Sequence, residues 1–196
     1  MHLFIELFTF GCFVAVLVHA AWCREGEGLA LFGSLVALGF VRENAVVLRG
    51  LLYGFAPLHL MLGKAPLIAT IIWGFSIYAA LVWAQEATGG PIGLRTPSVR
   101  VLGAVALFMI ALACFYEPFL RLIGMARWQE GTRATLGVPW IALVGYPTLA
   151  VGFLALWGGA AARGAGVRFA VLVVGIPALA LGHAFGLQAV KRALGW

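Results

Sequence analysis

Carboxyl groups inside apolar stretches are the residues of this chain best suited to chemistry. Glu117 lies near the end of the apolar run Val101–Ile123, and Glu43 interrupts another apolar run directly after Arg42. A carboxylate at membrane depth costs free energy unless it is paired, hydrated or protonated, so such a group marks a functional site by default. An acid in this setting can hold and transfer a proton, which is the basis of general acid–base catalysis.

Each of these glutamates also has a structural explanation. Arg42 or Arg49 could neutralise Glu43 in an ion pair. Arg121 follows Glu117 by four residues on the same helical face, which is the favourable order for a glutamate–arginine pair. The residues by themselves leave ion pairing and catalysis as open alternatives at both positions.

The composition places the chain in lipid. Hydrophobic residues make up 63% of the 196 positions, charged residues make up 10%, and the mean hydropathy is +1.04. Soluble domains carry roughly a quarter charged residues. The net charge of +6 comes from arginines spread over nearly every loop, which indicates contact with membrane lipids and excludes a clustered nucleic-acid-binding face.

Apolar runs of about 20 residues span the hydrocarbon core of a bilayer, which is roughly 30 Å thick. Six such runs predict spans at Leu3–Trp22, Leu29–Tyr53, Pro66–Gln85, Val101–Ile123, Val138–Trp157 and Phe169–Val190. Gly54, Pro57, Gly63 and Pro66 interrupt regular helix, so we expect the segment near 54–65 to be re-entrant or interfacial. The prediction is a single domain over 1–196, an all-α polytopic transmembrane helix bundle of six spans, with seven as the alternative. We find no internal repeat in the sequence.

Several classes of site are missing from the sequence. The chain has no glycine-rich phosphate-binding loop and no serine–histidine constellation, and its histidines show no i, i+4 pairing for a metal-binding helix face. We therefore expect no metal and no organic cofactor. The glycine-, alanine-, leucine- and arginine-rich composition suits a bacterial cytoplasmic (inner) membrane.

Two spaced motifs occur in a fixed order between about Gly39 and Tyr146. The first comprises Glu43, Gly50 and Gly54, followed by Leu62-Gly63 and Pro66. The second comprises Glu117-Pro118, Gly124 and Trp128, followed by Gly137-Val138-Pro139, Gly145 and Tyr146. Their order and spacing resemble the carotenoid biosynthesis membrane protein family, which includes the carotenoid 1,2-hydratases and bisanhydrobacterioruberin hydratase.

The resemblance implies a hydratase, an enzyme of the lyase class, that adds water to the acyclic end group of a carotenoid or other polyene lipid. Glu117 would protonate the terminal alkene, because an apolar pocket favours the neutral, proton-carrying form of a carboxylic acid. Glu43 would position the water or accept the proton that it loses. Aromatic faces would stabilise the cation, with Trp73, Tyr116, Trp128, Trp140 and Tyr146 as candidates. Gly50, Gly54, Gly124 and Gly145 would let the polyene approach the backbone, with close helix packing as the alternative.

The chain departs from the family pattern at polar positions. Ala113 stands where the family has an aspartate, Ala142 stands where it has an asparagine, and Tyr146 replaces a tryptophan. A water nucleophile needs polar partners to hold it. The two alanines therefore favour an alternative function: a non-catalytic membrane subunit that binds carotenoid or packs against membrane-protein partners in a larger complex.

Overall fold

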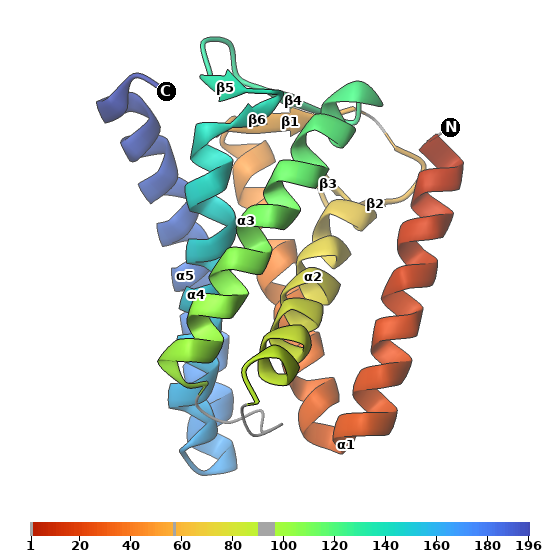
Figure 1. Cartoon of the computed structure of the whole chain (residues 1–196), viewed down its shortest axis with the longest axis vertical. Helices are drawn as coiled ribbons and strands as arrows, with labels where there is room; N and C mark the ends of the chain where they lie inside the picture. The colour runs from red at the N-terminus through yellow and green to blue at the C-terminus, as the bar shows by residue number, and fades with distance from the viewer. Residues whose placement is uncertain (1, 57, 90–96) are drawn as a thin grey trace.

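The computed structural model describes residues 2–56, 58–89 and 97–196 and shows a bundle of long apolar helices (Figure 1). The helices are α1 (His2–Leu48), α2 (Leu67–Ala87), α3 (Val99–Leu122), α4 (Trp140–Ala161) and α5 (Ala165–Leu194). Helix α1 turns back on itself at the lower end of Figure 1 and so provides two spans, Leu3–Trp22 and Glu27–Leu48. Six helical segments in the described residues are long and apolar enough to cross a membrane, which confirms the predicted integral membrane bundle.

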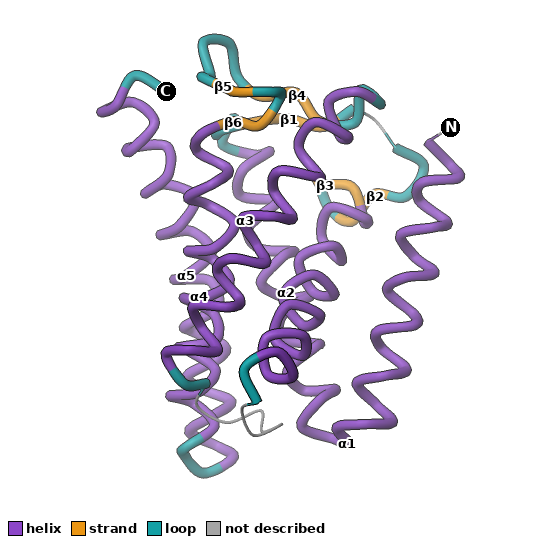
Figure 2. Tube along the Cα trace, viewed as in Figure 1, coloured by secondary structure: helices purple, strands orange, loops and turns teal. Residues whose placement is uncertain are grey.

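Six short strands gather at one end of the bundle, the end where both chain termini lie (Figure 2). They are β1 (Tyr53–Phe55), β2 (Met61–Leu62), β3 (Ala65–Pro66), β4 (Ala126–Trp128), β5 (Ala134–Thr135) and β6 (Val138–Pro139). Strands β2 and β3 form one hairpin, β5 and β6 form another, and β1 pairs antiparallel with β4. The segment predicted as re-entrant or interfacial is thus a strand and a hairpin at the bundle end, which favours the interfacial alternative.

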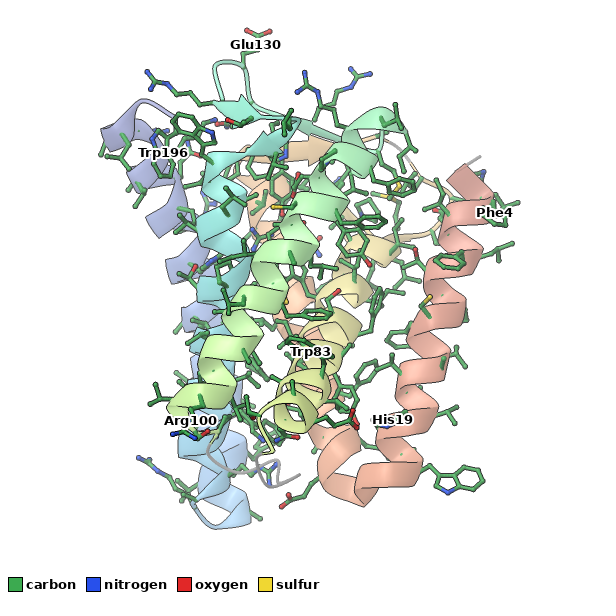
Figure 3. All side chains as sticks on the ribbon, in the orientation of Figure 1. Phe4, His19, Trp83, Arg100, Glu130 and Trp196 are labelled. Carbon is green, nitrogen blue, oxygen red and sulfur yellow. The ribbon has the colours of Figure 1, made fainter. Side chains whose placement is uncertain are left out.

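The polar side chains labelled in Figure 3 lie toward the two ends of the bundle. In Figure 3, Arg100 and His19 lie toward the end opposite the strands, while Glu130 extends beyond the strands at the other end. Phe4 points away from the bundle. Charged groups at both ends and apolar groups on the outer surface between them are the distribution that a bilayer requires.

The chain contains two segments with the same order of elements, which the sequence alone had not disclosed. The second half of α1 is followed by β1, the β2–β3 hairpin and α2, and α3 is followed by β4, the β5–β6 hairpin and α4. Local hydrogen bonds match as well. Leu51 donates its N–H to the carbonyl of Val46, and Met125, 74 positions later, donates to the carbonyl of Leu120, both at 2.9 Å.

The starts of α2 and α4 match in the same way. Leu67 donates its N–H to the carbonyl of Leu60 at 2.9 Å, and Trp140 donates to the carbonyl of Arg133 at 3.0 Å. A proline directly precedes each of these helices, where its missing N–H removes no helical hydrogen bond. The structure therefore contains an internal repeat that the residue pattern does not reveal.

The two repeats face each other through their equivalent strands. Gly54 of β1 pairs with Arg127 of β4 at the centre of the ladder. Antiparallel pairing of equivalent strands is what a local two-fold axis between them produces. The second half of α1 and α3 both run toward the strand end (Figure 1), so the axis lies along the bundle, as in transporters built from parallel repeats.

Within the first repeat, a pair of glycines lets α1 and α2 cross closely. A Cβ atom on Gly39 would overlap the carbonyl oxygen of Thr70, and one on Gly74 would lie 2.9 Å from Cγ2 of Val36. Small residues at a helix crossing allow the two backbones to approach, and the van der Waals packing that results contributes to helix association in lipid.

We expect Gly39→Ala to lower the free energy of unfolding by about 1–3 kcal/mol, because an added methyl group in a packed contact must push two backbones apart. The matched control is Gly33→Ala on the same helix, where no atom lies within 4 Å of the added Cβ. Its effect is expected to stay within ~1 kcal/mol. Denaturation of the purified protein with a graded series of anionic detergent measures both, and equal effects would contradict the packing argument.

Candidate functional site

A cavity of about 70 Å³ lies beneath the strands, between the helices of the two repeats. Its lining comes from both spans of α1, from α2, α3 and α4, and from strands β1 and β4. Glu43 and Glu117 both line it and both are buried. The remaining lining is mostly aromatic and aliphatic, so two carboxyl groups share one apolar chamber.

Glu43 lies in the last turns of α1 and is surrounded by hydrogen-bond donors. The hydroxyl of Tyr53 lies 3.0 Å from its Oε1 and 2.9 Å from its Oε2, and Nε1 of Trp73 donates to Oε1 at 2.5 Å. Arg42 forms an ion pair with Glu43 and also contacts the Tyr53 hydroxyl through the same Nη1. Glu43 therefore has a full cationic partner as well as two neutral donors.

Glu117 occupies the equivalent place in α3 but has no cationic partner among the described ion pairs. Nε1 of Trp128 donates to its Oε2 at 2.7 Å, and the hydroxyl of Tyr146 donates to its Oε1 at 2.8 Å. The expected pair with Arg121 is not formed, and Arg121 lies at the exposed surface. Of the two open alternatives, ion pairing holds for Glu43 through Arg42 and fails for Glu117.

The donors of one repeat touch those of the other. Each carboxyl group receives one donor from the strand and one from the following helix of its own repeat. The rings of Tyr53 and Trp128 then meet at a centroid distance of 4.8 Å, and those of Trp73 and Tyr146 meet at 5.0 Å. These two aromatic contacts link the hydrogen-bond shells of both carboxyl groups.

Arg42 makes the two half-sites unequal. Its guanidinium lies 4.7 Å from the ring centroid of Trp73 and 5.6 Å from that of Tyr53, within the range of cation–π attraction. The position 74 residues later holds Tyr116, which has no charge. One half-site is therefore an arginine–glutamate pair, and in the other the donors to the glutamate within the described part of the chain are the neutral side chains of Trp128 and Tyr146.

The structure brings six of the sequence-predicted site residues to the cavity. Besides the two glutamates, Trp73, Tyr116, Trp128 and Tyr146 line it. These six residues belong to five separate elements, and all six fall in the motifs or on the spans that the sequence singled out.

The other five sequence-predicted site residues do not line the cavity. Gly50 and Gly124 end α1 and α3 in the left-handed region at φ +58° and +69°, where a residue without a side chain is favoured. Gly54 lies in the β1–β4 ladder. Gly145 packs against Leu187, as the close-packing alternative predicted.

Trp140 is the fifth of these residues. Its Nε1 donates to Oγ1 of Thr135 at 2.8 Å, and its ring lies edge-on to Trp196 at a centroid distance of 5.9 Å. These contacts place Trp140 at the strand end of the bundle, away from the cavity, where its ring joins α4 to the end of the chain.

Sequence analysis missed Tyr53, whose hydroxyl contacts the side chains of both Arg42 and Glu43. The predicted helix ran to Tyr53, whereas α1 ends at Leu48 and Tyr53 begins β1. Gly50 was the residue in the sequence that could have indicated the true end of the helix. Its left-handed conformation ends α1 and redirects the chain toward β1. Burial raises the pKa of Tyr53 well above its usual value, so its hydroxyl keeps its proton and donates to Glu43.

Glu6 lies beside the cavity, where it has a structural role. It is buried on a span that is mostly not buried, and it accepts the backbone N–H groups of His59 at 2.9 Å and Leu60 at 3.2 Å, while Nδ1 of His59 lies at 2.8 Å. Its neighbours Ile5 and Thr9 line the cavity. Glu6 thus fastens the first span to the segment before β2 and holds it against the chamber.

No group of three or more histidine, cysteine, aspartate or glutamate residues is arranged for a metal ion within the described ranges 2–56, 58–89 and 97–196. The chain matches no protein-family model, no curated protein and no solved structure.

Proposed function

We propose that this chain is a membrane hydratase that adds water to the acyclic end group of a carotenoid-like polyene. One observation carries the proposal: two buried glutamates of unequal charge balance line a single apolar, aromatic cavity inside a transmembrane bundle. The substrate class follows from the resemblance of the two spaced motifs to the carotenoid biosynthesis family, and the cellular location that suits this function is a bacterial cytoplasmic membrane.

Glu117 is the proton donor in this mechanism. A carboxyl group without a cationic partner in an apolar chamber favours its neutral form, which carries a transferable proton. The hydrogen bonds from Trp128 and Tyr146 occupy one acceptor site on each oxygen and leave room for that proton. When the proton leaves, the same two donors stabilise the carboxylate that remains.

The reaction is an addition across a carbon–carbon double bond. The proton of Glu117 bonds to the less substituted alkene carbon, and the alkene electron pair forms the new C–H bond and leaves a tertiary carbocation. A water oxygen bonds to the cationic carbon, and Glu43 accepts the surplus proton. Transfer of that proton back to Glu117 restores both groups, so the net change is the gain of one water.

In this mechanism the position of Arg42 distinguishes the roles of the two glutamates. Arg42 forms an ion pair with Glu43, and in this mechanism Glu43 is the group that accepts a proton from the attacking water. The Tyr53 hydroxyl fixes both Glu43 oxygens in orientation. Tyr116 provides no charge at the matching position, which leaves Glu117 free to carry a proton.

Aromatic rings surround the point where the cation would form. Trp73, Trp128 and Tyr146 line the cavity, and their faces carry a negative quadrupole that attracts a positive charge. Desolvation strengthens such an attraction, which reaches about 2 kcal/mol when water is excluded. The chamber therefore combines an acid, a base and cation-stabilising walls.

A non-catalytic carotenoid-binding subunit is the second candidate. Ala113 and Ala142 favour it, because both are buried among helices and supply no polar group to the cavity. Such a protein would retain polyene in the chamber without changing it.

The deciding experiment expresses the chain in a bacterial host that accumulates an acyclic carotenoid. The hydratase predicts a pigment that has gained the mass of one water, detected by liquid chromatography with mass spectrometry and absent from cells with an empty vector. Unchanged pigment in cells whose membranes contain well-folded protein would reject the enzyme. Unchanged pigment that copurifies with the protein would identify the binding subunit.

A further inference from the structure

The cavity is too small for a whole lipid-soluble molecule. Its volume is about 70 Å³, whereas pockets that enclose a drug-sized ligand measure roughly 300–1,000 Å³. A chamber of this size holds one end of a long molecule. The rest of such a molecule must lie outside the chamber, on a surface that continues from it.

Helix α3 provides a surface that is continuous with the cavity. Phe119 lines the cavity, yet 38% of the residue is exposed. Phe115, one turn earlier, is 68% exposed, and its ring stacks on that of Phe119 at a centroid distance of 6.3 Å and an interplanar angle of 10°. Tyr116 lines the cavity and contacts Phe115 at 5.9 Å. The aromatic surface therefore begins inside the chamber and ends in lipid.

The first span of α1 borders the same opening. Ile5 and Thr9 line the cavity together with the α3 residues, and Glu6 between them is bonded to the His59–Leu60 segment. On the far side of the bundle, by contrast, Gly145 of α4 packs directly against Leu187 of α5. The side between the first span and α3 is thus the one where a surface leads outward.

We propose that Phe115, Tyr116 and Phe119, with the first span opposite, form a binding subsite for the linear apolar tail of the molecule whose end occupies the cavity. This inference rests on the proposed function for the identity of the end group only. Helix α3 runs toward the strand end, so Phe115 lies farther from that end than Phe119 and nearer the bilayer interior (Figure 1).

The chemistry of the subsite selects an apolar tail over a lipid head group. Glu117, the charged residue between Phe115 and Phe119 in the sequence, is buried and lines the chamber. The exposed rings offer flat apolar faces that match a conjugated chain, and stacked aromatic contacts contribute about 0.5–1.5 kcal/mol beyond the area that they bury.

The test compares two probes on the protein in lipid nanodiscs. The long probe is the methyl ester of trans-parinaric acid, a linear tetraene whose fluorescence is excited by energy transfer from tryptophan, and Trp73 and Trp128 lie at the cavity. The short probe is a dimethyloctadiene, a branched diene with an end group but no long tail, which competes for the chamber alone. Neither measurement requires turnover.

Phe115→Ala is expected to weaken binding of the tetraene about three- to tenfold, from the loss of one aromatic contact. The affinity of the short diene is expected to stay unchanged. The matched control is Phe169→Ala, which removes a phenylalanine that is 71% exposed on α5 and is expected to change neither affinity.

Three results would overturn the subsite: equal effects of Phe115→Ala and Phe169→Ala, equal weakening of the long and the short probe, or no binding of the tetraene to the unaltered protein. A failed hydration assay with preserved discrimination between the probes would reject the enzyme and keep the subsite. The hydratase and the tail-binding subsite can therefore be rejected independently of each other.

Discussion

Replacing Glu117 by glutamine is expected to abolish the water-adduct pigment while leaving the helix bundle intact. The carboxamide oxygen can still accept hydrogen bonds from Trp128 or Tyr146, so the local structure keeps most of its contacts. The amide carries no proton that it can give to an alkene. General acid catalysis contributes about 10²–10⁴-fold to rates, so product should fall by about that factor in the mass-spectrometric assay.

Two further variants make this result specific. Glu117→Asp keeps the acid but shortens the side chain, so we expect partial activity, above that of the glutamine variant. Glu27→Gln is the matched control, because Glu27 is a half-exposed glutamate that lies 3.7 Å from Arg168, and its product yield should equal that of the unaltered protein. Undiminished product from Glu117→Gln would remove Glu117 from the mechanism.

Among the substitutions for which we predict a change in stability, Arg42→Met is expected to lower the free energy of unfolding the most. The change leaves Glu43 as an uncompensated charge in an apolar chamber, and breaking a buried pair on one side costs about 3–5 kcal/mol. It also removes the cation–π contacts with Trp73 and Tyr53. Unfolding in graded anionic detergent, followed by tryptophan fluorescence, measures the difference.

The double variant Arg42→Met with Glu43→Leu separates the charge from the packing. Replacing a buried ion pair by apolar residues of similar size is often neutral or stabilising, so most of the lost free energy should return, while hydration activity stays absent. Arg49→Met is the control, because Arg49 is exposed and should shift stability by less than about 0.5 kcal/mol. A double variant as unstable as Arg42→Met would show that uncompensated charge is not the cause.

The spans could be predicted from sequence because long apolar runs have few alternatives in a bilayer. The span Leu3–Trp22 is reproduced to the residue, and the predicted span Pro66–Gln85 corresponds to Leu67–Ala87. Glu43 and Glu117 were identified for the same reason: a carboxyl group in an apolar run conflicts with its surroundings. Their meeting in one cavity could not be derived from either run alone.

The geometry of the site could not be predicted from the sequence, because it depends on strands of two or three residues. Tyr53 is placed by a three-residue strand, and strands of that length leave no alternating pattern in the sequence. The repeat was hidden because the two copies agree in backbone hydrogen bonds and in a few positions such as Pro66 and Pro139, while most side chains differ. Gly50 and Gly124 were assigned to substrate passage, whereas their positive φ angles end helices.

The matched pair of two-span units also suggests how such a molecule arises. Each unit crosses the bilayer twice and so finishes on the side where it began, which allows a second copy to follow in the same orientation after gene duplication and fusion. An ancestor that consisted of one such two-span unit could have built the paired half-sites by self-association across the axis. In such a homodimer the two acids would have identical surroundings. After fusion, a single charge-changing substitution at position 42 or 116 would have given the two acids different roles.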